Sequence, residues 1–176
     1  LIERANDLYA ASASAEAAHW YRRAMPLRDA RADASAYVGL GAALHASGRV
    51  SEALGVLRAG AEVNPSFPSL QFNLATVSTD AKDFAGAARA WRRVLSGGGA
   101  PAAAHRAAGA VFEKVRRYSE AHAAYAASAR IEPSNWQAHY TSAHALLHSA
   151  LRGRRQRSGA AAEQPSDVEE VADALF

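Results

Sequence analysis

A period of 34 residues runs through the middle of this sequence and restricts the folds open to it. In each period a small residue is followed by a bulky side chain and then by a residue that ends helices. These triplets are Ala53, Leu57 and Pro65; Ala87, Trp91 and Gly99; and Ala121, Tyr125 and Pro133. Alanine, the best helix former, is the most frequent residue, whereas proline and aromatic residues are few. The pattern predicts an all-α chain built from stacked copies of one helical unit.

Each period has room for two helices joined by a short turn. Small residues recur in the first helix, where it must approach its partner closely: Gly41, Ala75, Gly109 and Ala143. Turn residues follow that helix in each unit: Ser47-Gly48, then Asp83, then Arg116-Arg117-Tyr118. We expect the hydroxyls of Ser51 and Ser119 to cap the second helix of their units. The expected unit is therefore an antiparallel helical hairpin.

The spacing Tyr37-x2-Leu40-Gly41-x2-Leu44, then Ala53-x3-Leu57, then Pro65, resembles the tetratricopeptide repeat. The resemblance implies a right-handed α-solenoid of antiparallel helix pairs, with about three clear repeats and degenerate terminal ones. The clear repeats span residues 34–67, 68–101 and 102–135. The second is the weaker copy, because Ser78 replaces a large residue and Gly99 replaces proline.

The pattern degrades on both sides of these repeats. Residues 1–33 predict a degenerate helix pair, with a lengthened turn between Pro26 and Asp33. Residues 136–151 predict a C-terminal capping helix, followed by a basic, flexible linker at 152–165. Residues 166–176 predict a short amphipathic helix that begins with a capping box. This last helix is expected to cap the solenoid, to occupy its groove as a pseudo-ligand, or to bind a partner.

No constellation in the sequence predicts catalysis, a cofactor or a metal site. The absence of cysteine removes thiolate chemistry and cysteine-ligated zinc. The run Gly97-Gly98-Gly99 lacks the lysine and hydroxyl residues that complete a phosphate-binding loop. His144 and His148 lie one helical turn apart, but no carboxylate at matching spacing completes a metal site. We therefore expect a protein that is not an enzyme.

The resemblance implies a concave groove lined by the first helix of each repeat. Carried over by register, the groove positions are Val38, Ala42, His45, Phe72, Asn73, Thr76, Arg106, Lys114, Tyr140 and His144. Small residues around a few aromatic and imidazole side chains suit a protein or peptide partner. Repeats that bind the acidic tails of chaperones use a clamp of lysines, asparagines and an arginine. Here only Asn73 matches that clamp, and Ala103 and Ala107 stand at its basic positions. The sequence therefore disfavours a chaperone-tail clamp.

Basic residues exceed acidic ones in the repeats, nine against five between Pro65 and Ala150. The predicted basic patch consists of Arg89, Arg92, Arg93, Arg116 and Arg117. It favours an acidic partner surface. The arginine run at 152–157 has no interleaved aromatic residue, so nucleic acid is not the expected partner.

These features predict a non-catalytic scaffold or adaptor that binds a protein or peptide partner. Two alternatives stay open: a permanent subunit of a large complex, organellar or membrane-associated, or the repeat domain of a larger enzyme. No continuous apolar stretch approaches the roughly 18 residues of a transmembrane helix. A cytoplasmic or organelle-interior location is the working expectation. Partner and pathway are not encoded in the repeat itself.

Overall fold

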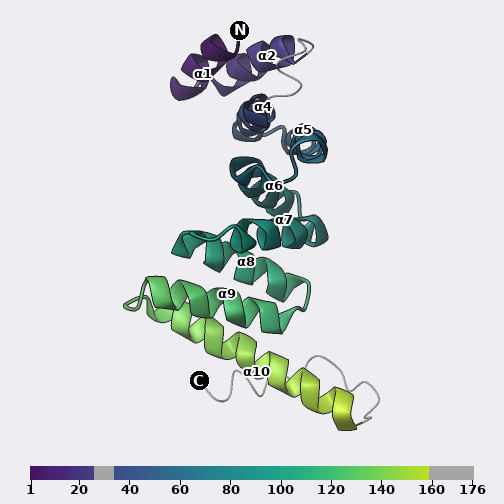
Figure 1. Ribbon diagram of the computed structural model, residues 1–176, viewed down its shortest axis with the longest axis vertical. Coiled ribbons are helices and arrows are strands. Elements are labelled where there is room, and N and C mark those ends of the chain that lie inside the picture. The colour runs from purple at the N-terminus through teal and green to yellow at the C-terminus, as the bar shows by residue number, and fades with distance from the viewer. Residues whose placement is uncertain (26–33, 159–176) are drawn as a thin grey trace. The chain divides into compact units, whose positions relative to one another are not determined.

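A computed structural model describes residues 1–25 and 34–158, and within these ranges the regular elements are all α-helices (Figure 1). The chain divides into two compact units, Leu1–Gly98 and Gly99–Phe176. The first unit contains α1 (Ile2–Ala10), α2 (Ser14–Ala24), α4 (Ala34–Ala46), α5 (Val50–Val63), α6 (Pro68–Asp80) and α7 (Phe84–Ser96). The second unit contains α8 (Ala102–Lys114), α9 (Tyr118–Ile131) and α10 (Trp136–Ser158).

The helices keep the register of the sequence period. α4, α6 and α8 begin at Ala34, Pro68 and Ala102, and their partners α5, α7 and α9 begin at Val50, Phe84 and Tyr118. Each helix packs against the next one of its pair, and α10 packs against α9. The predicted all-α solenoid of helical hairpins is therefore confirmed. α1 and α2 form a further packed pair at the N-terminal end of the first unit.

The last described helix is longer than the sequence predicts. α10 continues past residue 151 through the arginine run to Ser158. Arginine is a good helix former, and the Arg152 guanidinium donates to the carbonyl of Arg116 at 2.8 Å, which ties this part of α10 to the α8–α9 turn. The expected turn at 26–33, the rest of the predicted linker and the helix at 166–176 lie outside the described residues.

The bulky residue of each repeat is buried in the helical packing. Leu57, Trp91 and Tyr125 are at most 4% exposed. A Cβ atom added to Gly41 would lie 2.6 Å from the Leu57 side chain, and one added to Gly109 would lie 2.6 Å from the Tyr125 ring. Both contacts are too short for a real Cβ atom. The small residues therefore admit the bulky side chain of the partner helix, as the repeat pattern predicts.

One turn geometry joins the two helices of every described pair. The turn residue is in the left-handed region, with φ between 57° and 78°, at Ser12, Gly48, Lys82 and Arg116. The next amide donates to a carbonyl five residues earlier, over 2.7 Å in the α8–α9 turn and 2.9 Å in the others. This bond is the one that ends a helix in a Schellman motif. Gly48, Lys82 and Arg116 are 34 residues apart, so the turn recurs with the repeat although only one of these three residues is glycine.

The expected serine caps are wrong. α5 and α9 have Arg49 and Arg117 at the N-cap position, and neither helix has a side-chain cap. The Ser119 hydroxyl lies 2.8 Å from that of Ser149 on α10 instead. Asp83 occupies the equivalent position before α7, and its carboxylate accepts the amide of Gly86 at 3.0 Å. The cap position thus precedes the serines in the repeat.

The Asp83 cap predicts an acid-dependent loss of stability. The amide of Gly86 holds the pKa of Asp83 below its ordinary value against an opposing effect of partial burial, and Arg58, 2.7 Å away, lowers this pKa further. A lowered pKa in the folded state means that the stabilisation is present above the ordinary pKa of about 3.9 and is lost as pH falls through the lowered value. We expect Asp83→Ala to reduce the free energy of unfolding by about 1 kcal/mol at neutral pH.

Chemical denaturation of both proteins across acidic pH tests this prediction. The difference between wild type and Asp83→Ala should shrink as the solution becomes acidic enough to protonate Asp83. Asp83→Asn is the matched control, because its uncharged side chain still caps the helix and does not titrate. A pH-independent difference between wild type and Asp83→Ala would contradict this account.

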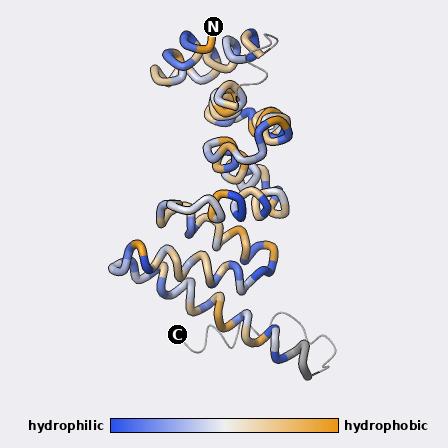
Figure 2. Tube along the Cα trace, in the orientation of Figure 1, coloured by the Kyte–Doolittle hydropathy of each residue, from blue (hydrophilic) through white to orange (hydrophobic). Residues whose placement is uncertain are grey.

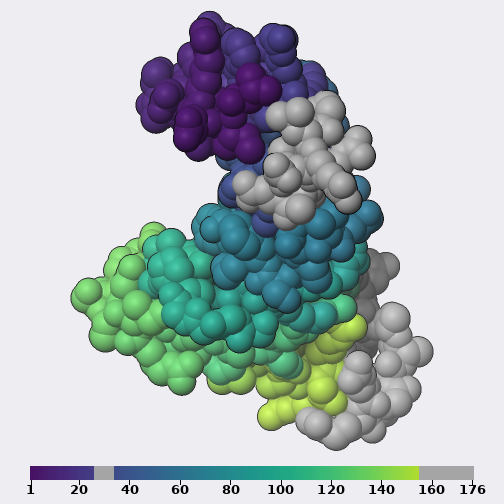
Figure 3. Space-filling model, turned by 45° about the horizontal axis from the view of Figure 1, so that its top comes forward, coloured from purple at the N-terminus to yellow at the C-terminus, as the bar shows by residue number. Residues whose placement is uncertain are grey.

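Hydrophobic and hydrophilic residues are mixed along every described helix (Figure 2). Within residues 1–25 and 34–158, no helix combines the length and apolar character that crossing a membrane requires. In the second unit, α9 packs against both α8 and α10, and Figure 3 shows the atoms of this unit in close contact on the face in view. The core of each unit therefore lies between its helices, and the outward faces are available for other roles.

Candidate partner-binding surfaces

The predicted groove positions of the first unit lie on α4 and α6, which pack side by side. Val38, Ala42 and His45 on α4 are all partly buried. His45 Nε2 lies 2.7 Å from the Asp80 carboxylate, so an ion pair or hydrogen bond joins the C-terminal ends of the two helices. The structure thus places the predicted positions of α4 and α6 on neighbouring helices. The Asp80 carboxylate adds a charged group at the C-terminal ends of these helices.

Phe72 is the exposed aromatic residue of this face. Its side chain is 42% exposed, and its ring meets the Trp91 ring edge-on with centroids 5.4 Å apart. This contact holds one side of the ring while leaving much of it in solvent. Asn73 and Thr76 donate to the α6 carbonyls of Ser69 and Phe72, at 2.8 and 3.1 Å. The α4–α6 face, defined by Val38, Ala42, His45, Phe72, Asn73 and Thr76, therefore offers an aromatic ring with polar neighbours.

Of the predicted groove positions on α8, one is paired within the unit and the other is exposed. Arg106 on α8 lies 2.5 Å from Glu132 and 3.3 Å from the Ser128 hydroxyl, so its charge is used to join α8 to α9. The hydrogen bond from Asn135 lowers the pKa of Glu132, and Arg106 lowers it further. Lys114 is exposed at the C-terminal end of α8. The sequence does not indicate the pairing of Arg106 with Glu132, which only the packing of α8 on α9 brings about.

Tyr140 and His144 lie on α10 with their rings stacked, 6.3 Å between centroids. His144 Nδ1 lies 3.5 Å from Glu113 of α8, and Glu113 also accepts the Tyr125 hydroxyl at 3.0 Å. Burial, and then the Glu113 charge, raises the pKa of Tyr125, which keeps this hydroxyl protonated as a donor. The structure therefore links the predicted residue His144 to the buried repeat tyrosine through one carboxylate.

His148 extends this group of side chains on α10. Its Nε2 lies 3.1 Å from that of His144, and its ring stacks on Tyr118 at 5.0 Å. In the part of the chain that the structure describes, no group of three or more potential ligands is arranged to hold a metal ion. The spacing of the two histidines is visible in the sequence, whereas their partners on α8 and α9 are not.

The residues of the predicted basic patch fall in both units. Arg89, Arg92 and Arg93 are exposed on α7 of the first unit. Arg116 and Arg117 are exposed at the α8–α9 turn of the second unit, where Arg117 lies 3.5 Å from Glu120. The predicted patch is therefore divided: one basic surface belongs to the first unit and the other to the second. The sequence places Arg152 in the arginine run at 152–157 and not in this patch, whereas α10 brings it to the basic surface of the second unit.

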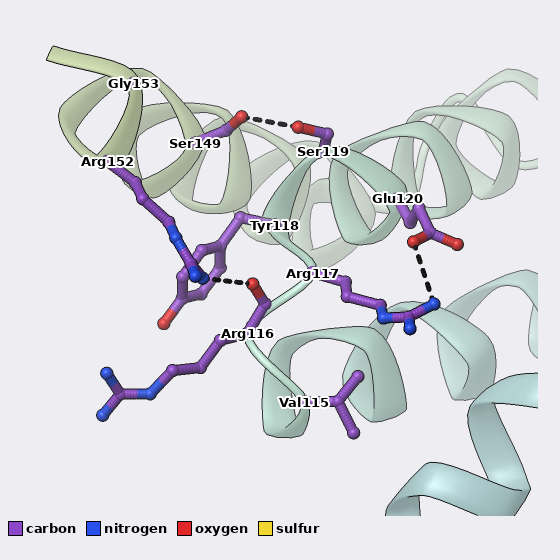
Figure 4. A pocket seen from close by; sticks show the side chains of 9 residues that line it. All are labelled: Val115, Arg116, Arg117, Tyr118, Ser119, Glu120, Ser149, Arg152 and Gly153. Carbon is purple, nitrogen blue, oxygen red and sulfur yellow. Dashed lines mark hydrogen bonds and ion pairs between the residues drawn. The ribbon is translucent and has the colours of Figure 1, made fainter. Parts of the chain in front are cut away.

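A hollow of about 700 Å³ lies at that second surface (Figure 4). Its walls come from the α8–α9 turn, the first turn of α9 and one segment of α10. The lining residues are Val115, Arg116, Arg117, Tyr118, Ser119, Glu120, Ser149, Arg152 and Gly153. The hydrogen bonds from Arg152 to Arg116 and between Ser119 and Ser149 connect α10 to the other walls. We call this site the arginine hollow.

Comparison with known proteins supports the fold. No protein-family model and no curated protein matches the sequence. MamA from Desulfovibrio magneticus RS-1 aligns with a TM-score of 0.69 at 15% identity, over 90% of this chain and 94% of that one. YrrB, a TPR protein described as having an unusual peptide-binding site, aligns with a TM-score of 0.62 at 14% identity, over 74% of this chain and 66% of that one.

A third solved structure agrees with these two. TTC0263, a thermophilic TPR protein of Thermus thermophilus, aligns with a TM-score of 0.57 at 19% identity, over 81% of this chain and 78% of that one. At such low identities the likeness concerns the fold. The chain therefore has the tetratricopeptide-repeat fold, as its 34-residue period predicts.

Proposed function

We propose that this protein is a non-catalytic scaffold that holds a protein or peptide segment on the α4–α6 face. The observation that carries the proposal is Phe72, a large aromatic side chain that is 42% exposed yet held by the buried Trp91. Aromatic residues with a fixed orientation are typical anchors of binding surfaces, because they bury much area and lose little conformational entropy.

The surroundings of Phe72 support an extended or helical peptide as the ligand. Ala42 is a small residue on the facing helix, and Val38 and His45 lie on the same helix. Asp80, paired with His45, places a polar group at one end of the face. A central apolar anchor bordered by polar groups is a common arrangement of peptide-binding surfaces. The description of YrrB as having a peptide-binding site agrees with this proposal for the fold.

We also propose that the part of the partner that lies against α7 carries acidic residues. Arg89, Arg92 and Arg93 are exposed on that helix, and Arg89 acts electrostatically on Asp83. Such an exposed basic surface accelerates association with an acidic partner and makes it sensitive to salt.

Selection of displayed random peptides against the purified chain tests the α4–α6 face. We expect Phe72→Ala to weaken the affinity of the chain for the selected peptides by about tenfold or more. Removing a central aromatic anchor costs more than about 1.4 kcal/mol of binding free energy. Phe67→Ala is the matched control, because Phe67 is also a phenylalanine and is 38% exposed, but precedes α6. Failure to select any peptide, or equal loss with both variants, would count against the proposal.

A permanent subunit of a larger assembly is the second candidate. Apolar side chains along α10 favour it: Trp136 is 70% exposed and Leu146 is 51% exposed. Obligate interfaces are more apolar than transient ones. Cross-linking in the native source followed by mass spectrometry separates the candidates, because a permanent subunit gives stoichiometric links from α10 to one complex. A transient scaffold gives weaker and more varied links near Phe72.

A further inference from the structure

The arginine hollow has an excess of positive charge. Three of its lining residues are arginines, and Glu120 is its one lining carboxylate. Arg117 already pairs with Glu120, which leaves the charges of Arg116 and Arg152 to set the local potential. Figure 4 shows the Arg116 side chain reaching away from the turn and the Arg152 guanidinium lying against the turn. The hollow therefore attracts anionic groups.

The geometry of the walls suits carboxylates on a peptide. The Arg152 guanidinium uses one nitrogen to donate to the Arg116 carbonyl, at 2.8 Å, and a guanidinium has five N–H donors in all. Guanidinium groups bind carboxylates through paired hydrogen bonds. The lining also contains the hydroxyls of Tyr118, Ser119 and Ser149, of which the two serine hydroxyls already bond to each other. A volume of about 700 Å³ is large enough for several side chains.

The sequence beyond α10 has the complementary charge. From Ser158 to Phe176 it contains no lysine or arginine, and its acidic residues are Glu163, Asp167, Glu169, Glu170 and Asp173. The α10 wall of the hollow ends at Gly153, and the helix itself ends at Ser158. The helix between these two residues spans about 7.5 Å, whereas the chain from Ser158 to Glu163 can extend over about 17 Å. The acidic segment is therefore long enough to return to the hollow.

We propose that the acidic segment 163–173 of this chain occupies the arginine hollow of the same molecule. Tethering through a few residues raises the effective concentration of the segment to the order of millimolar, so a weak attraction is sufficient for occupancy. The bound segment would screen the basic surface of the second unit from other anionic molecules. The proposal concerns a different surface from the α4–α6 face and does not depend on it.

The absence of cysteine permits a direct test on the full chain. A spin label is attached to Ala172→Cys, and the amide signals of Arg117 and Tyr118 are followed by NMR. We expect the label to reduce these signals about twofold or more at low salt, and the reduction to disappear at high salt because the attraction is electrostatic. Unchanged signals at low salt would overturn the proposal.

Charge reversal identifies the groups responsible. Glu169→Lys/Glu170→Lys leaves every described residue unaltered and should abolish the signal loss. Arg116→Glu/Arg152→Glu should also abolish it, and the combination of all four changes should restore it. The control Arg89→Glu/Arg93→Glu should leave it unchanged. Persistence of the signal loss in both hollow and segment variants would overturn the proposal.

Two further outcomes would assign the hollow to a different occupant. If a spin-labelled chain broadens the signals of a separate, isotopically labelled chain equally well, the occupant is a second copy. If an added glutamate-rich peptide enters the hollow while the chain's own segment does not, the hollow is a site for a foreign acidic partner. Either result would contradict the intramolecular contact.

Discussion

Replacing Trp91 with alanine is expected to lower the free energy of unfolding by about 3–5 kcal/mol. The indole is 2% exposed and lies at the bulky position of its repeat. Its Nε1 faces the Thr79 hydroxyl at 3.4 Å, and its ring supports the exposed Phe72 ring. Alanine would leave a cavity between α6 and α7 and would remove the contact that orients Phe72. Urea denaturation followed by circular dichroism measures the effect.

Trp136→Ala is the matched control for this prediction. It removes the same side chain at a position that is 70% exposed, so its effect should stay within about 0.5 kcal/mol. Trp91→Phe keeps most of the packed volume while losing the polar contact to Thr79, and is expected to cost less than Trp91→Ala. Equal stability of the Trp91→Ala and Trp136→Ala variants would show that the repeat core does not depend on its bulky position.

Gly109→Ala is expected to destabilise the chain by about 1–3 kcal/mol, although alanine is the better helix former. The added Cβ would lie 2.6 Å from the Tyr125 ring. That ring is 4% exposed, and its hydroxyl is bonded to Glu113, so it cannot move aside easily. Gly55→Ala is the control, because Gly55 lies within α5 with no atom near its added Cβ. It should stabilise by about 0.5–1 kcal/mol.

A double-mutant cycle isolates the contact between Gly109 and Tyr125. In a Tyr125→Ala background the ring is absent, so Gly109→Ala should become neutral or stabilising. Thermal or urea denaturation of the four proteins gives the coupling. If Gly109→Ala lowers the free energy of unfolding equally in both backgrounds, the small residue is not needed to admit the Tyr125 ring, and this account of the α8–α9 contact is wrong.

The sequence predicts the local backbone well, because each repeat carries its own helix and turn information. Helix propensity and the spacing of small, bulky and helix-ending residues are properties of neighbouring positions along the chain. The starts of α4, α6 and α8 therefore follow the period, and so does the turn at Gly48, Lys82 and Arg116. The serine caps were misplaced because a hydroxyl near a helix start does not identify the N-cap residue itself.

The candidate surfaces could be predicted only in part. Repeat register predicts a groove position at Phe72, and in the structure its ring is partly exposed. Register does not distinguish it from Arg106, which is paired with Glu132. Long side chains choose partners across the packed helices, and that choice depends on the distance and orientation of neighbouring helices rather than on spacing along one helix.

The helical hairpin, its 34-residue register and the burial of one bulky residue per repeat are all predictable from the sequence, because they follow from periodic local preferences. Helix packing determines which charges are paired, the link from Tyr125 to His144 through Glu113, and the contact of Arg152 with Arg116 at the arginine hollow. These residues are distant along the chain, and their contacts arise when helix packing places them within a few ångströms of each other.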